Sequence, residues 1–357
     1  MKEVPTNMIL QGDALDRLKQ LPDGSIDCMI TSVPFFQQRN YFAPGQIGLE
    51  ETVDEWIDRL RPIMGEIRRV LTPTGSAWVD IGDTYSRHAR AGAPRKSLLL
   101  SPQRLALSLV DDGWICRNVA IWAKSNPMPS SVGDRLSNTY DIVLHLVKQE
   151  RYYYDLDAIR QEHRSGNARS DRSADSRRPE WSGPHAGSNS GLHRFRPPGI
   201  AGHLLGKNPG DLWRLPTGRS YQGHHATFPE RLVERPLLAT CPLRVCAACD
   251  RPWRRGPGKT YVIGKRLPVT QSDRFIRRYS GSWRVLRQPG PLQADCQCAA
   301  PWRRGRVLDP FFGTGTVGVV AERLGRDWIG IEISKEYAAL AWQRLGRSGP
   351  SNLKEVA

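Results

Sequence analysis

The sequence predicts an α/β protein built on a doubly wound, mostly parallel sheet. Short apolar runs alternate with amphipathic segments from Met8 to about Lys148, and the same pattern returns from Val307 to Arg347. Strands that alternate with helices form parallel sheets with helices on both faces. A glycine-rich turn at 308–316, between a predicted strand and a predicted helix, is the usual cradle for a nucleoside-bearing ligand. We therefore expect one Rossmann-like sheet assembled from both ends of the chain.

Hydrophobic periodicity locates the individual elements. Residues 52–71 carry apolar side chains at helical spacing and predict an amphipathic helix. The predicted strands are Asp27–Thr31, Gly75–Asp83, Ile115–Ala123, Ile142–Val147 and Trp328–Glu332. Further helices are expected at Ala14–Leu21, Ser101–Asp112, Thr227–Arg235 and after the glycine-rich turn.

Changes in composition divide the chain into five parts. Residues 161–211 are rich in Arg, Ser, Gly, Asn, His and Pro and lack apolar periodicity, so they cannot bury enough surface to fold alone. Residues 246–298 are arginine-rich and bracketed by cysteines. We expect 1–160, 212–245 and 299–357 to form the main domain, 161–211 a basic flexible linker, and 246–298 a separate recognition insert.

Charge and targeting signals constrain the partner and the compartment. With 52 Lys and Arg against 36 Asp and Glu, the formal net charge is +16, which favours an anionic partner; a generally basic, arginine-rich proteome is the alternative explanation. No apolar run after Met1 suits a signal peptide, and none is long enough to span a membrane. Seven cysteines, four of them in two close pairs, fit a reducing compartment and a metal better than disulfides. We expect a cytoplasmic protein with no membrane association.

The glycine-rich turn predicts a cofactor site. Gly313 and Gly315 permit a tight turn and close backbone approach, and we expect Gly315 to lie against the ligand. Glu332 ends the next strand roughly twenty residues later, the position from which a carboxylate binds ribose hydroxyls. Asp13, after a short apolar run, is a second candidate for the cofactor, or else a helix-capping residue.

A second loop, Ser32-Val33-Pro34-Phe35, follows the first predicted strand and suits a planar base. An exocyclic amine becomes nucleophilic when its protons are accepted by hydrogen bonds, which the Ser32 hydroxyl and the Val33 carbonyl can provide. Pro34 stiffens the turn, and Phe35 offers a stacking face for a base taken out of the duplex.

Together these loops resemble those of the amino-methylating DNA methyltransferases. That family has a catalytic loop (Asp/Ser/Asn)-Pro-Pro-(Tyr/Phe) and an S-adenosylmethionine loop Asp-Pro-Phe-X-Gly-X-Gly, and the catalytic loop comes first in its circularly permuted β group. Val33 departs from the pattern, because the first proline is missing. Further similar segments are Gly82–Tyr85, Trp122–Pro129, Asn138–Asp141 and Ala226–Pro229. The resemblance covers most of the chain except about 161–205 and 250–295.

The resemblance implies a methyltransferase fold and S-adenosylmethionine as cofactor. The residues that it implies for cofactor binding are Asp13, Asp309, Phe311, Gly313, Thr314, Gly315, Thr316 and Glu332. A serine at the head of the catalytic loop favours N4 of cytosine as the target, and N6 of adenine is the alternative.

Four cysteines predict a structural zinc site. Cys246 and Cys249 form a Cys-X-X-Cys knuckle, and Cys296 and Cys298 form a tighter pair about fifty residues later. Free thiols are the alternative. Cys241 is an outside candidate for a ligand, whereas Cys28 and Cys116 are expected in the core.

These observations predict a site-specific methyltransferase acting on double-stranded DNA, with a cognate restriction endonuclease as a further partner. The alternative from another class is a zinc-bearing DNA-binding protein of weak catalytic power, for which Val33 is the indication. An NAD-dependent oxidoreductase is disfavoured, because no catalytic His, Tyr or Lys constellation accompanies the glycines.

Overall fold

The computed structural model describes residues 4–161, 205–218, 228–256, 259–263 and 284–346. The chain divides into two compact units. The first comprises Met1–Asp155, Gly210–Trp253 and Ala294–Ala357, and the second comprises Leu156–Pro209 and Arg254–Gln293. Most of the segment expected as a flexible linker, 162–204, lies outside the described residues.

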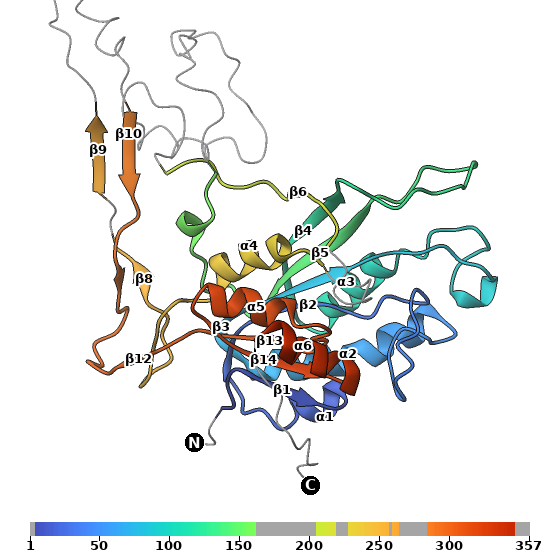
Figure 1. The fold of residues 1–357 in the computed structure, drawn as a ribbon, viewed down its shortest axis with the longest axis horizontal. Coiled ribbons are helices and arrows are strands. Elements are labelled where there is room, and N and C mark those ends of the chain that lie inside the picture. The colour runs from blue at the N-terminus through green and yellow to red at the C-terminus, as the bar shows by residue number, and fades with distance from the viewer. Residues whose placement is uncertain (1–3, 162–204, 219–227, 257–258, 264–283, 347–357) are drawn as a thin grey trace, which may run out of the picture. The chain divides into compact units, whose positions relative to one another are not determined.

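An eight-stranded sheet forms the centre of the first unit, in the order β1-β14-β13-β2-β3-β5-β4-β6 (Figure 1). Its strands are β1 (Met8–Gln11), β2 (Ile26–Ser32), β3 (Leu71–Ile81), β4 (Ile115–Lys124), β5 (Tyr140–Val147), β6 (Leu212–Leu215), β13 (Arg306–Asp309) and β14 (Asp327–Glu332). All neighbours pair in parallel except β5, which runs antiparallel to β3 and β4. The predicted α/β class and mostly parallel sheet are confirmed.

The C-terminal strands are inserted between N-terminal ones. Met8 of β1 pairs with Ile329 of β14, and Val307 of β13 pairs with Cys28 of β2. The two ends of the chain therefore complete one sheet, as the sequence predicted. This arrangement brings the carboxyl ends of β2 and β13, where the two predicted loops begin, side by side.

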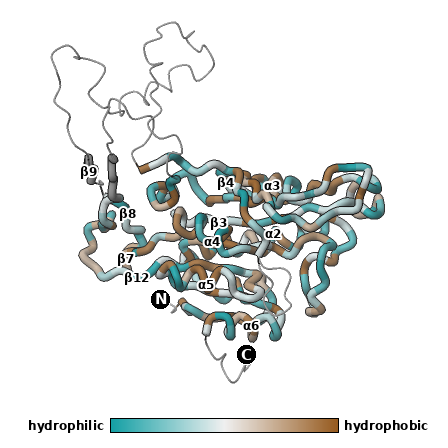
Figure 2. The backbone as a smooth tube through the Cα atoms, turned by 45° about the horizontal axis from the view of Figure 1, so that its top comes forward, coloured by the Kyte–Doolittle hydropathy of each residue, from teal (hydrophilic) through white to brown (hydrophobic). Residues whose placement is uncertain are grey.

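Three helices cover each face of the sheet. On one face lie α1 (Ala14–Leu18), α2 (Val53–Val70) and α3 (Ser101–Asp111); on the other lie α4 (Glu230–Thr240), α5 (Thr316–Arg323) and α6 (Lys335–Arg344). Helix α2 begins at Thr52, whose hydroxyl accepts from the Glu55 amide while the Glu55 carboxylate accepts from the Thr52 amide. Its buried stripe has the spacing that the sequence predicted. In Figure 2 hydrophobic segments gather in these central layers.

Short antiparallel pairs lie around the expected insert. In the first unit, β7 (Val245–Cys246) pairs with β12 (Trp302–Arg303). In the second, β8 (Arg254–Arg255) pairs with β11 (Leu292–Gln293), and β9 (Lys259–Ile263) pairs with β10 (Arg284–Gln288). The chain thus leaves the first unit and returns to it through paired strands. No helix in the described part of the chain is long and apolar enough to cross a bilayer.

Candidate active site and cysteine cluster

The two predicted loops line one cavity of about 560 Å³ in the first unit. Of the residues proposed from the sequence for the catalytic and cofactor sites, those that line it are Asp13, Ser32, Val33, Pro34, Phe35, Phe311, Gly313, Thr314, Thr316 and Glu332. Asp309 and Gly315 are not among the lining residues. The juxtaposition follows from the sheet order, because β1, β14, β13 and β2 are consecutive neighbours.

Glu332 holds the cofactor loop in its turn. Its Oε2 accepts from the Gly313 amide at 2.7 Å, and its Oε1 accepts from the Ser334 amide at 2.8 Å. Burial raises the pKa of Glu332, and these amides oppose the rise. Each carboxylate oxygen has a second lone pair, so both can still accept from a ligand hydroxyl.

The two glycines of the loop have different surroundings. Gly313 has a φ of +51°, and a Cβ added there would meet nothing within 4 Å. Gly315 is buried at the N-cap of α5 with a φ of +78°, and a Cβ there would lie 3.1 Å from Phe312 and 3.2 Å from Ala341. The position of a Cβ at Gly315 thus faces the protein interior, whereas Gly313 borders the cavity.

Asp309 lies beneath the loop. Its Oδ1 accepts from the Thr31 hydroxyl at 2.6 Å and from the Phe311 amide at 3.0 Å, while its Oδ2 is buried without a partner among the described residues. Burial raises the pKa of Asp309 to about 7. Asp309 shapes the turn from below the cavity.

Asp13 caps a helix, which is one of the two alternatives that its sequence position left open, and it also borders the cavity. Its Oδ1 caps α1 by accepting from the amides of Leu15 and Asp16 at 2.9 and 3.2 Å. The residue also lines the cavity. The preceding residue, Gly12, donates its amide to the Glu332 carbonyl at 2.9 Å, and this bond joins the end of β1 to the end of β14.

The catalytic loop is held from two sides. Ser32 lies opposite Asp80 in the β2–β3 register, and its interaction with the Asp80 carboxyl group lowers the pKa of Asp80 against the effect of burial. The amide of Val33 donates to the Asp80 carbonyl at 3.3 Å, and the Pro34 carbonyl accepts from Trp56 Nε1 at 2.9 Å.

Valine is well accommodated at position 33. Its side chain is 3 % exposed and packs in the core beneath α2. A proline there would have no amide to donate to Asp80. This loop is therefore stiffened by a hydrogen bond and by packing at the position where the resembling family has its first proline.

Three charged residues at the cavity were not singled out for a catalytic or binding role from the sequence. Lys124 Nζ lies 2.7 Å from Asp141 Oδ2, and both residues line the cavity together with the buried Asp80. Burial and then repulsion by Asp141 raise the pKa of Asp80 well above its usual range. Burial also raises the pKa of Asp141, against the effect of Lys124. The available signal was an acid inside one predicted strand, Asp80, and an acid directly before another, Asp141. Their proximity depends on the antiparallel pairing of β5 with β3.

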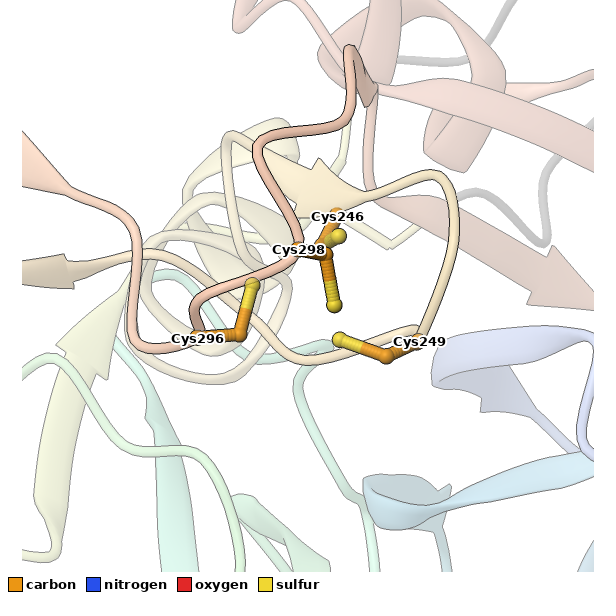
Figure 3. A group of neighbouring side chains, drawn as sticks. All are labelled: Cys246, Cys249, Cys296 and Cys298. Atoms are coloured by element: carbon orange, nitrogen blue, oxygen red, sulfur yellow. The ribbon is translucent and has the colours of Figure 1, made fainter.

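The four cysteines predicted to bind zinc meet in one group. Cys246 and Cys249 come from β7 and the turn after it, and Cys296 and Cys298 precede β12 (Figure 3). Their sulfur atoms all lie within 4.8 Å of one another. Sulfurs bound tetrahedrally to one zinc ion at about 2.3 Å lie roughly 3.8 Å apart, so small side-chain movements fit the group to the ion.

Local hydrogen bonds shape this cysteine cluster. The amides of Ala248 and Cys249 donate to the Cys246 sulfur, and the amide of Cys298 donates to the Cys296 sulfur. The outside candidate Cys241 is fully buried in the core near Cys28 and is not in the group. Of the two cysteines expected in the core, Cys28 is fully buried and Cys116 is partly buried.

Arg303 connects the cysteine cluster to the central sheet. Its Nη1 donates to Asp27 Oδ2 at 2.6 Å, and its Nη2 donates to Asp250 Oδ1 at 2.9 Å. Asp250 directly follows Cys249, and Asp27 lies in β2. The knuckle is thereby joined to the strand that ends at Ser32.

Several known proteins are similar to this chain. The pattern of the DNA methylase family, the N6/N4 methyltransferases, matches residues 26–243 and 299–343. The type II methyltransferase M.SfiI of Streptomyces fimbriatus is 33 % identical over 93 % of this chain and 89 % of its own length. M.Cfr9I of Citrobacter freundii is 30 % identical over 94 % of this chain and 87 % of its own length. A solved structure of the PvuII DNA methyltransferase, named as cytosine-N4-specific, has a TM-score of 0.55 at 19 % identity, and the match covers 96 % of this chain and 86 % of that one.

Proposed function

Because this chain belongs to the DNA methylase family of N6/N4 methyltransferases, we propose that it uses S-adenosylmethionine to methylate an exocyclic amino group of a base in DNA. One observation carries the proposal: a cofactor-type loop and a base-type loop line the same cavity. A nucleoside cofactor at one and a flipped base at the other would bring methyl donor and amine together.

The residues around Glu332 suit the cofactor. The Glu332 carboxylate is oriented by two amides and suits ribose hydroxyls, and Gly313 leaves open space beside it. Asp13, Phe311, Thr314 and Thr316 complete this part of the cavity, while Asp309 and Gly315 support the loop from within. When bound, S-adenosylmethionine supplies an electrophilic methyl group on a sulfonium.

The residues of the catalytic loop suit the base. A Ser32 hydroxyl that donates its hydrogen to the neighbouring Asp80 would keep its lone pairs for one amine hydrogen. The Val33 carbonyl can accept the other, and Phe35 provides the stacking face. Both hydrogen bonds strengthen as the amine becomes tetrahedral and attacks the methyl group.

We favour N4 of cytosine as the target, because a serine heads the catalytic loop and the PvuII enzyme of similar fold is named cytosine-N4-specific. N6 of adenine is the alternative. The net charge of +16 and the type II names of the relatives support double-stranded DNA as substrate, a cognate restriction endonuclease and a cytoplasmic site of action.

We further propose that Cys246, Cys249, Cys296 and Cys298 hold one structural zinc ion. Four thiols at closed-site spacing, with amides donating to two of the sulfurs, favour a tetrahedral site without an open position. The ion would fix both ends of the segment 246–298, whose arginines suit recognition of phosphates and guanine edges.

The rival function, a DNA-binding protein of weak catalytic power, depended on Val33. That residue keeps its carbonyl, and its amide and side chain stiffen the loop in another way. The deciding experiment is sequencing of DNA from cells that express the protein, scored for N4-methylcytosine and N6-methyladenine in context. Absence of both marks, with DNA binding intact, would favour the rival function.

A further inference from the structure

Lys124 is a charged residue that lines the cavity and has no role in the methyl transfer proposed above. Its side chain is 24 % exposed, and its Nζ lies 5.3 Å from the centroid of the Trp122 ring. Among the described residues, the ammonium group is hydrogen-bonded to Asp141 alone. An ammonium has three donor hydrogens, so two remain for a ligand in the cavity.

Asp141 holds this ammonium beside the predicted base site. A Cβ added to Gly82 would lie 2.6 Å from Phe35 Cε2 and 3.0 Å from Asp141 Oδ1. The stacking ring and the carboxylate that anchors Lys124 therefore flank the same glycine. The Lys124 charge also acts on Asp80, which is the hydrogen-bond partner of Ser32. Ser32, Asp80, Asp141 and Lys124 all line the same cavity.

We propose that Lys124 reads the target base by donating to cytosine N3, beside the reacting amine, and to O2 beyond it. This inference rests on the proposed methylation of a flipped base and names which base the cavity accepts. Cytosine presents two acceptors in a row next to its amine. Adenine presents N1 in the first position and a C–H in the second. With adenine bound in the cavity, one donor of Lys124 would face a C–H group in place of an acceptor, and such a mismatch is disfavoured.

The alternative role of Lys124 is purely structural, an ion pair that joins the ends of β4 and β5. The two roles differ in one measurable respect. A structural ion pair affects folding and all DNA equally, whereas a residue that contacts the base affects only DNA that carries the base.

The test uses the full-length protein and two duplexes containing the methylated sequence, once sequencing has located it. One duplex carries the target base, and the other has an abasic position there. Binding of both is measured for the wild type and for Lys124→Met, which keeps the length of the side chain and removes the donors. In Lys124→Met the affinity for the base-bearing duplex relative to the abasic duplex should fall by about 10- to 100-fold. Methylation efficiency, kcat/KM, should fall similarly, with S-adenosylmethionine affinity unchanged.

Two further variants serve as controls, one for poor folding of Lys124→Met and one for the loss of a lysine outside the cavity. Lys124→Met combined with Asp141→Asn avoids a stranded buried carboxylate and should give the same fall if the single variant folds poorly. Lys96→Met removes the lysine of an exposed Lys–Asp pair, Lys96–Asp134, that does not line the cavity, and should leave the ratio of the two affinities unchanged.

Each outcome decides one question. An unchanged affinity ratio in both Lys124 variants overturns the role of Lys124 and leaves the proposed methylation standing. Formation of N6-methyladenine by the wild type likewise keeps methylation and overturns the reading of cytosine O2. If the wild type methylates no DNA, the proposed function fails and this inference fails with it.

Discussion

Thr31 donates its hydroxyl to Asp309 Oδ1 at 2.6 Å, a bond between residues 278 positions apart in the sequence. Thr31 directly precedes Ser32, and Asp309 opens the glycine-rich loop. The bond therefore joins the strand that leads into the Ser32 loop to the glycine-rich loop. Both residues are buried, so the connection is insulated from water.

The first prediction concerns the charge of Asp309. Its pKa is raised from 3.8 to about 7, so the folded state holds a proton that the unfolded state releases. Proton binding by Asp309 therefore stabilises the folded state fully below about pH 4. This stabilisation, up to about 4 kcal/mol, is lost as the pH rises through 7. Asp309→Asn keeps an acceptor for Thr31 and does not titrate. The free energy of unfolding, measured with urea, should fall less from pH 5 to pH 8 in the variant than in the wild type. Equal falls in the two proteins would contradict a buried, protonated Asp309 carboxyl group.

The second prediction separates the two glycines of the cofactor loop. Gly315→Ala places a Cβ against Phe312 and Ala341, so it should lower the melting temperature more than Gly313→Ala does. Gly313→Ala directs its Cβ into open space at the cavity, so it should weaken S-adenosylmethionine binding with the smaller loss of stability. Calorimetric titration and thermal melts of both variants give the comparison. The reverse order of effects would place the ligand against Gly315.

A third prediction concerns Glu332. Glu332→Ala removes the acceptor for the Gly313 amide and for the cofactor hydroxyls, so S-adenosylmethionine should bind more weakly by roughly 1–3 kcal/mol. The matched control is Glu336→Ala, because Glu336 is an exposed glutamate in the first turn of α6, and this variant should bind S-adenosylmethionine normally. Equal affinities for the two variants would remove Glu332 from the cofactor site.

The fourth prediction tests the catalytic loop. Ser32→Ala removes an oxygen that is needed as the amine becomes nucleophilic, so kcat should fall about 100-fold or more at unchanged cofactor affinity. Val33→Pro keeps the carbonyl and loses the amide bond to Asp80, so it should retain turnover with about 1 kcal/mol less stability. Single-turnover assays measure the first effect and denaturant unfolding the second. Full turnover by Ser32→Ala would show that another group accepts the amine hydrogen.

The fifth prediction concerns the metal. Elemental analysis should find one zinc ion per chain, and Cys249→Ser should release it and weaken DNA recognition more than cofactor binding. Cys116→Ser, a cysteine outside the cluster, should retain the metal. A metal-free wild type with four alkylatable thiols at the cluster would end the assignment.

Short stretches of sequence were sufficient to predict both loops, the grouping of the four cysteines and the alternation of strands and helices. Each depends on chemistry that neighbouring residues carry together: glycines before a helix, a hydroxyl before a proline, two thiols separated by two residues. Glu332 could also be predicted, because its distance from the glycines follows from one helix and one strand.

Other features were decided only by the tertiary structure. Asp80, Asp141 and Lys124 come from three strands, and they meet because β5 runs antiparallel between β3 and β4. Gly315 faces inward because α6 packs Ala341 against it, and Val33 is held because its amide meets the Asp80 carbonyl of the neighbouring strand. A local pattern specifies which groups a residue carries, but which groups surround it depends on strand order and on packing between distant segments.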